Sequence, residues 1–514
     1  MSTSTKINYL VAAAFVIGSA SAQNQSAPNV SQVLMYSTVT TTNVGAQFSQ
    51  SSLFTPDASG SIPHALFGIY TERAASGAIN TPGTYQPASP TALNSAVSSA
   101  IGVALSLIPV ASPASAVIRK TDPATGLEVG ADSTLGPILT ERAETIGKRK
   151  WFLGISHQDF HFTSINGQSL NGLSILYQGG DSSTITPANG KNTTQPATFN
   201  LGLDVRLSQD LAFVTYGATD RVDISVGIPM VHSAVAATAY NALVFTGDGL
   251  GGGGPQAGSN CWCMNTLSPG TFQTTQALIG QSAMAKSGIG DLLVRVKGAV
   301  VDRSQAVVSV GTDLRFATGD AGNFLGTGTT TIKPFLAVSL YSKPSSSGVV
   351  FSPHFNIGWQ FSGKSELGGT LNGTPQTVTM GGETVPYIGA PMIVTKDYLP
   401  DVFQWSVGTE FALGHRNTVV VDILGNQVGW IHGAQTVREA SAPGFSPIAP
   451  YASATASGLV GVTGRTSFGQ YSGSFGYKVK VASNLVATFN ALVRLDNNGL
   501  TARFVPLYGL SYTF

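Results

Sequence analysis

The sequence predicts an all-β fold, a transmembrane antiparallel β-barrel of about 12 strands (12–14), and three observations support it. From about residue 150 to residue 514, apolar and polar residues alternate with a period of two, as in strands. Charged residues make up only 10% of the 514 residues, whereas soluble globular proteins carry about 25%. Long and short connections between the predicted strands alternate along the chain, as they do in bacterial membrane barrels.

The first predicted element is a signal peptide at residues 1–22. Lys6 supplies its positive charge, residues 7–17 are an apolar run, and Ala20-Ser21-Ala22 forms a small-residue cleavage site. No later run approaches the ~18–20 consecutive apolar residues that a membrane helix requires. We therefore expect an exported chain that crosses a membrane with strands.

Residues 23–149 form a predicted N-terminal segment that does not alternate. Ser89-Pro90 is typical of a helix start, and we expect a short helix over about residues 90–105. Residues 114–121 and 127–134 flank a turn that contains Pro and Gly, which indicates a hairpin. We expect this segment to plug the barrel lumen or to lie in the periplasm. The alternative is that it adds two strands to the barrel.

Residues 150–514 form the predicted outer-membrane β-barrel. In residues 291–297, for example, the charged positions fall on one face of a strand and the apolar positions on the other. We expect strands near residues 150–164, 197–217, 221–232, 287–300, 304–317, 330–342, 348–361, 402–413, 416–429, 466–480, 484–497 and 501–514. Alternation alone also fits a soluble sandwich. The long loops on one rim and tight turns on the other favour the membrane barrel.

The charged residues of these strands are candidate pore-lining residues, because lipid accepts only the apolar face. The candidates are Asp204, Arg206, Asp223, Asp291, Arg295, Lys297, Asp313, Arg315, Glu410, Asp422, Lys478, Lys480, Arg494 and Arg503. Two roles remain open: salt-bridged ladders that fill a narrow barrel, or an electrostatic path for a solute. Arg295, Lys297, Asp313 and Arg315 are the candidates for a constriction, since adjacent strands carry both signs there.

The chain has 2 cysteines, Cys261 and Cys263, which are separated by one residue. In an oxidising compartment this spacing predicts a local disulfide, with two free thiols as the alternative. No second Cys/His pair supplies zinc ligands, and neither an H-E-x-x-H nor a G-x-S-x-G pattern is evident. We therefore expect no metal, no cofactor and no catalytic residue, and the chain is not predicted to be an enzyme. Its net charge of +1 gives no support for a nucleic-acid partner.

The predicted last strand carries aromatic residues on one face and ends at Tyr512 and Phe514. This ending resembles the C-terminal strand signature of outer-membrane barrels, in which the terminal Phe is read during assembly. The resemblance implies that Tyr512 and Phe514 act as an assembly signal for the barrel-assembly machinery. It also implies a location in the outer membrane of a Gram-negative-type bacterium, in contact with outer-membrane lipid.

Several motifs, in this order along the chain, resemble the outer-membrane barrels of the MetA pathway of phenol degradation family. They are Asp122-Pro123-Ala124-Thr125-Gly126, Gly136-Pro137, Glu141-Arg142-Ala143-Glu144-Thr145-Ile146-Gly147, Tyr216-Gly217-Ala218-Thr219-Asp220-Arg221 leading to Ile228-Pro229, Gly290-Asp291-Leu292-Leu293-Val294-Arg295-Val296-Lys297, Ala317-Thr318-Gly319-Asp320 and Leu325-Gly326-Thr327-Gly328. The resemblance covers roughly residues 90–514. A more distant similarity, to FadL-type fatty-acid and toluene channels, would favour 14 strands and an N-terminal plug.

The resemblance implies an outer-membrane channel or transporter that passively admits small hydrophobic or aromatic molecules. The alternative is a surface structural or adhesion protein that is anchored by a barrel with a closed lumen. An outer-membrane hydrolase is a third hypothesis, for which no converging catalytic set is evident in the sequence.

Overall fold

A computed structural model of the chain describes residues 90–109, 119–121, 128–130, 135, 138–179, 195–246, 271–274, 278–303, 305–341, 351–369, 371–380, 383–414, 416–437, 458–482 and 484–514. The predicted signal peptide and the predicted disulfide between Cys261 and Cys263 lie outside the described residues.

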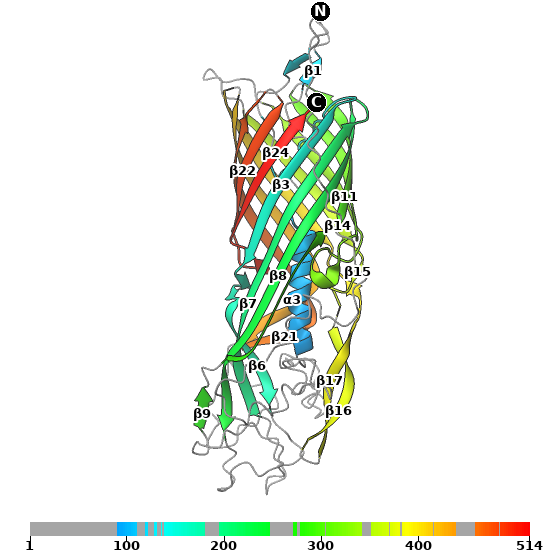
Figure 1. Cartoon of the computed structure of the whole chain (residues 1–514). Helices are drawn as coiled ribbons and strands as arrows, with labels where there is room; N and C mark the ends of the chain where they lie inside the picture. The colour runs from blue at the N-terminus through cyan, green and yellow to red at the C-terminus, as the bar shows by residue number, and fades with distance from the viewer. Residues whose placement is uncertain are drawn as a thin grey trace, which may run out of the picture.

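A closed antiparallel barrel of 12 strands dominates the described structure and confirms the predicted fold class. Around the barrel the strands are β3 (Trp151–Phe162), β7 (Gln195–Gly217), β8 (Val222–Thr246), β11 (Leu292–Arg303), β12 (Ala306–Phe316), β13 (Thr331–Leu340), β14 (Phe351–Ser362), β19 (Val402–Leu413), β20 (Asn417–Val437), β21 (Gly458–Lys480), β22 (Leu485–Arg494) and β24 (Phe504–Thr513). Each strand pairs with the next, and β24 pairs with β3 to close the barrel (Figure 1). Closure leaves no edge of unpaired backbone groups, for which hydrocarbon supplies no hydrogen-bond partner.

The outer face of the barrel is apolar where the strands cross the membrane. On β14, Phe355, Trp359 and Phe361 are exposed, whereas Ser352 and His354 on the other face of the strand are buried. The last strand, β24, repeats this pattern with its aromatic residues outside. Exposed apolar and buried polar side chains reverse the arrangement of soluble proteins and are typical of a transmembrane barrel.

On β3, β7 and β8 this polarity reverses towards the long-loop rim. On β3, Leu153 and Ile155 are exposed near the short-turn rim, whereas Asp159 and His161 are exposed further along the strand. Phe160, between these two polar residues, is buried inside. An outer face that changes from apolar to polar marks the point where a strand leaves hydrocarbon for water. The long strands β7 and β8 therefore continue past this point into water, and Figure 1 shows both extending beyond the end of β3.

A helix lies inside the half of the barrel next to the long loops (Figure 1). This helix, α3 (Pro90–Ser106), occupies the range in which the sequence predicts one. Ile101 of α3 belongs to one apolar cluster with Phe160, Leu203 and Val205 of the barrel wall. The interior at this level is thus an ordinary apolar core. No helix in the described ranges is long and apolar enough to cross a membrane.

A second stretch, residues 138–147, lies inside the barrel near the short-turn rim and is called the lumenal segment below. Its backbone and side-chain groups form hydrogen bonds with side chains of β8, β13 and β20, which belong to different parts of the wall. The segment therefore crosses the lumen. The hairpin of β1 (Arg119–Thr121) and β2 (Glu128–Gly130) lies beyond the rim at which the chain ends (Figure 1).

The remaining described elements lie on the long-loop side of the barrel. They are β4 (Ser164–Ile165), β5 (Gln168–Ser169), β6 (Asn171–Gly179), β9 (Thr271–Thr274), β10 (Leu278–Ile289), η2 (Ala321–Asn323), β15 (Lys364–Ser365), β16 (Leu371–Met380), β17 (Glu383–Val394), β18 (Asp397–Tyr398) and β23 (Leu500–Thr501). β10 continues the line of β11 and pairs with the outer part of β8. The sequence did not predict these additions to the barrel.

Candidate functional site

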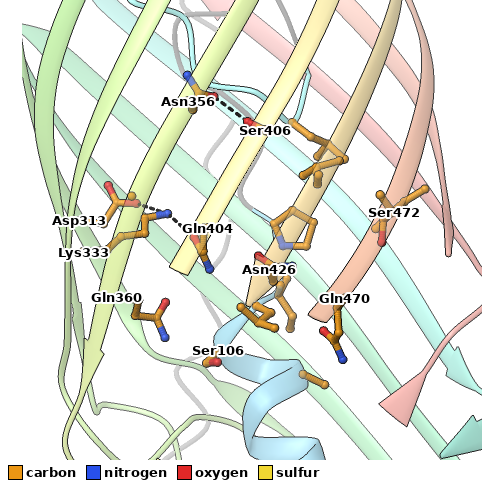
Figure 2. Close-up of a pocket in the computed structure, with 18 of the residues that line it drawn as sticks. Ser106, Asp313, Lys333, Asn356, Gln360, Gln404, Ser406, Asn426, Gln470 and Ser472 are labelled. Carbon is orange, nitrogen blue, oxygen red and sulfur yellow. Dashed lines mark hydrogen bonds and ion pairs between the residues drawn. The ribbon is translucent and has the colours of Figure 1, made fainter. Parts of the chain in front are cut away.

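A cavity of about 190 Å³ lies in the lumen between the end of α3 and the lumenal segment. Ser106 at the end of α3 and the following Leu107 and Ile108 line it on one side, and Leu139 and Glu141 of the lumenal segment line it on the other. The barrel strands supply the remaining wall. Figure 2 shows polar side chains from neighbouring strands pointing into this space.

An ion network around Glu141 fastens the lumenal segment to the wall. The Glu141 carboxylate accepts hydrogen bonds from Arg295 Nη1 at 2.5 Å and from Lys297 Nζ at 2.8 Å. Arg295 also donates two hydrogen bonds to Asp313, at 2.6 and 2.9 Å, and Lys333 Nζ lies 3.1 Å from Asp313. Four of these five side chains are almost completely buried. Buried charges require such partners, because removing them from water is costly.

Arg315 has a different partner. Its Nη1 donates to the backbone oxygen of Leu105 at 2.9 Å and contacts that of Ser106 at 3.4 Å. The last carbonyls of a helix have no partner within the helix, and a cation there is favourable. The four residues predicted to form a constriction therefore divide: Arg295, Lys297 and Asp313 take part in the network that holds the lumenal segment, whereas Arg315 holds α3.

Three further carboxylates among the predicted pore-lining residues are buried inside the barrel. Asp223 accepts a backbone N–H of the lumenal segment at 3.0 Å, and Asp422 accepts a threonine hydroxyl of the same segment at 3.0 Å. Glu410 lies 2.5 Å from His354 Nε2. Lys478 is buried in the same region and donates to a backbone oxygen at residue 135 at 3.3 Å. Asp223, Asp422 and Lys478 thus contact chain segments inside the barrel, as Arg295, Lys297 and Arg315 do.

Asp291 has a local structural role. Its carboxylate accepts hydrogen bonds from Gly319 N at 3.0 Å, from Thr327 N at 2.7 Å and from Thr327 Oγ1 at 2.6 Å. Gly326 approaches the same carboxylate so closely that a Cβ there would collide with it. Asp291 therefore fixes the loop between β12 and β13 at the junction of β10 and β11.

The predicted inward direction is wrong for Asp204 and Arg206. Both are exposed on the outer face of β7 and pair with each other at 3.0 Å, whereas the adjacent Leu203 and Val205 are buried inside. This part of β7 lies beyond the change in polarity, so its charged face meets water and its apolar face packs towards α3. Charge marks the inner face only where a strand is surrounded by lipid.

Three of the predicted pore-lining residues lie near the ends of strands. Arg494 contributes to the cavity lining and lies 3.4 Å from Asp496. Arg503 is exposed just before β24, and Lys480 is half-buried at the end of β21. Arg494 therefore faces the lumen, whereas Arg503 lies exposed at the long-loop rim.

Sequence reasoning quoted the charges of the lumenal segment only as part of a family motif, and it missed their role as ionic partners and the amides of the cavity wall. Glu141, Arg142 and Glu144 form a charged run within a stretch for which no element was predicted. Their density, in a chain with only 10% charged residues, is the signal that would have identified a partner for the inward charges. Gln360 and Gln404 were missed because only charged inner positions were considered.

The chemistry that this site offers is hydrogen bonding and apolar contact. Within the described ranges, no group of three or more His, Cys, Asp or Glu side chains is placed to hold a metal ion. The ionised side chains around the cavity hold internal segments in place. The arrangement is suited to binding or admitting a small molecule.

Comparisons with solved structures identify membrane channels of low similarity. An outer membrane channel from Pseudomonas putida F1 aligns at 9% identity with a TM-score of 0.36, over 72% of this chain and 98% of that one. A FadL homologue from Pseudomonas aeruginosa aligns at 11% identity with a TM-score of 0.30, over 79% and 98% of the two chains. The toluene transporter TbuX from Ralstonia pickettii aligns at 10% identity with a TM-score of 0.32, over 72% and 90%.

No known protein family and no curated protein matches this chain by sequence. Membership in the phenol degradation family therefore stays a prediction.

Proposed function

We propose that this protein is an outer-membrane channel that passively admits small hydrophobic or aromatic molecules. One observation carries the proposal: a cavity of about 190 Å³ inside the barrel, bordered by two chain segments that are not part of the wall. An apolar engineered cavity of about 150 Å³ binds benzene, so the space suits a molecule of one ring. Phe160 and Phe162 line part of it with aromatic surface.

Passage requires the lumenal segment or α3 to move, because both lie across the lumen. The lumenal segment is attached through polar contacts, which include the Glu141 network and the bonds to Asp223 and Asp422. Smaller apolar clusters with the wall accompany them. α3 is embedded in an apolar core. A polar attachment can exchange its partners for water, so we assign the movable barrier to the lumenal segment.

Liposome swelling tests the proposal. Purified full-length protein is reconstituted in liposomes, which are then diluted into isotonic solutions of small solutes. We expect faster swelling than in protein-free liposomes for solutes of one ring. Vesicles that remain sealed to all solutes, also under conditions that weaken ion pairs, would exclude a channel.

A barrel-anchored surface protein with a closed lumen is the second candidate. It is favoured by the tight filling near the short-turn rim, where Arg142 is completely buried. In that case the long-loop side of the barrel makes the contacts with other surfaces, and the cavity is an internal void without a function. Sealed vesicles together with binding of intact cells to a surface would support this candidate.

Localisation and assembly follow from the same proposal. The apolar outer face indicates a lipid environment, and the exposed Tyr512 and Phe514 at the end of β24 are in reach of an assembly factor. We expect the protein to fractionate with outer-membrane lipid. No enzymatic activity is part of the proposal, and assays of lipid or peptide turnover are expected to give no signal.

A further inference from the structure

The cavity has two chemically different sides. Phe160 and Phe162 of β3, whose ring centroids are 6.2 Å apart, line it together with Leu107 and Ile108 from the end of α3. The opposite side, on β14 and β19 to β21, carries amide and hydroxyl side chains (Figure 2). A small molecule in this space therefore meets apolar surface on one side and hydrogen-bonding groups on the other.

The polar side contains a row of amides that is built by the strand register. Gln404 of β19 pairs directly with Asn426 of β20, and Asn426 pairs with Gln470 of β21. Directly opposite residues have Cβ atoms about 4.5–5.5 Å apart, so the three amides span roughly 10 Å. Gln360 of the neighbouring β14 extends the row (Figure 2). This span matches the length of a molecule of one ring with a short substituent.

Within the described part of the chain, one amide donor of this side has no partner. Gln360 is 5% exposed, and its Nε2 makes no hydrogen bond there. Other amides of the row have partners: Gln404 Oε1 accepts from Lys333 at 3.2 Å, and Gln470 Nε2 donates to the backbone oxygen of Asn498 at 3.2 Å. An unpaired buried donor is unfavourable. A ligand that accepts a hydrogen bond would remove this penalty.

The charged side chains around the cavity bind one another or backbone oxygens, so none of them needs an ionic ligand. Asp313 lies between Arg295 and Lys333, and Arg315 is bonded to carbonyls at the end of α3. Glu141 accepts hydrogen bonds from two cations. Each of these charged groups already has a partner, so an ionic ligand would have to displace one of these contacts to gain its own.

From these contacts we infer that the cavity is a binding site for an uncharged one-ring molecule with a hydrogen-bond acceptor such as a carbonyl oxygen. The oxygen accepts from Gln360 Nε2, and the ring lies against Phe160 and Phe162. This inference deepens the proposed channel function and rests on it. The site selects for an acceptor as well as for an apolar body.

Isothermal titration calorimetry on the full-length protein in detergent micelles tests the inference with three probes of similar shape. Acetophenone has the acceptor, ethylbenzene lacks it, and benzoate is charged. We expect acetophenone to bind most tightly. In Gln360→Leu we expect the Kd of acetophenone to rise about tenfold, as for the loss of one buried hydrogen bond, and that of ethylbenzene to stay equal or fall.

Gln209→Leu is the matched control, because Gln209 is a buried inward glutamine of β7 that does not line this cavity. We expect it to bind acetophenone as the wild type does. Comparing variants at one detergent concentration cancels partitioning into micelles, and far-UV circular dichroism verifies the barrel fold of each variant.

Several outcomes would overturn the inference. They are equal affinities of the wild type for acetophenone and ethylbenzene, tighter binding of benzoate, no binding of any probe, or an unchanged Kd in Gln360→Leu. Liposome swelling is independent of these titrations. A channel that swells liposomes but does not prefer acetophenone would refute this site alone, whereas sealed vesicles with the expected binding would refute transport alone.

Discussion

Removing the Glu141 carboxylate should release the lumenal segment. Among the described residues, Glu141→Ala leaves Arg295 with Asp313 as its ionic partner and Lys297 with two backbone oxygens, each at 2.8 Å. Breaking a buried ion pair by removal of one partner costs about 3–5 kcal/mol. Since about 1.4 kcal/mol is a factor of ten, the ratio of released to attached segment should rise by roughly two to three and a half orders of magnitude.

Single-channel recording in planar lipid bilayers measures this ratio as the open probability. We expect Glu141→Ala to show frequent or long-lived conductance steps where the wild type is mostly closed. Asp204→Ala is the control: it removes the same charge, but Asp204 is exposed on the outer face of β7, where its partner Arg206 stays in water. Because this pair does not contact the lumenal segment, its loss should leave the open probability near that of the wild type.

Two results would refute the reasoning. If Glu141→Ala and the wild type have the same open probability, the ion network does not hold the barrier. If Asp204→Ala opens the channel as much as Glu141→Ala, the effect comes from the lost charge, and not from the contact with the wall.

Four further predictions concern other parts of the barrel. Asp313→Asn leaves Arg295 and Lys333 without their shared carboxylate, so the reversal potential in a salt gradient should shift towards anion selectivity; an unchanged potential would reject a lumenal role for Asp313. Asp204→Asn combined with Arg206→Gln should leave that potential unchanged, because both side chains are on the outer face; a shift would place them in the conduction path. Gly326→Ala should loosen the loop between β12 and β13, since the new Cβ collides with the Asp291 carboxylate, and limited proteolysis should detect faster cleavage there than in the wild type. Removal of Phe514 should lower the fraction of folded barrel in the outer membrane, measured by heat-modifiable migration in gels, and an unchanged fraction would mean that this residue is not an assembly signal.

The strands that cross the membrane were predictable because their environment is simple. Lipid outside and a polar interior impose a strict alternation, so β14 and β19 begin and end within a few residues of the predicted ranges. The same rule was wrong for Asp204 and Arg206, because the solvent outside β7 changes from lipid to water along one strand. Alternation fixes two faces of a strand but does not identify which face is inside.

The cavity depends on contacts between residues far apart in the sequence. Glu141 meets Arg295 and Lys297, more than 150 residues away, and only the folded barrel brings them together. The positions of α3 and of the lumenal segment follow from tertiary packing and have no periodic signature. The amides Gln360 and Gln404 carry no charge, so nothing in a single sequence distinguishes them from ordinary polar positions.

The reversal of polarity along β3, β7 and β8 also fixes how deeply the molecule is immersed. A shift of the barrel by two residues in one direction would place His157 or Asp210 against acyl chains, and a shift in the other would place Ile155 in water. Charged side chains on a lipid-facing surface are unfavourable in a depth-dependent way. A detergent belt therefore needs to cover only the apolar outer face of the barrel. The outer parts of β3, β7 and β8, whose outer face is polar, are expected to stay in water.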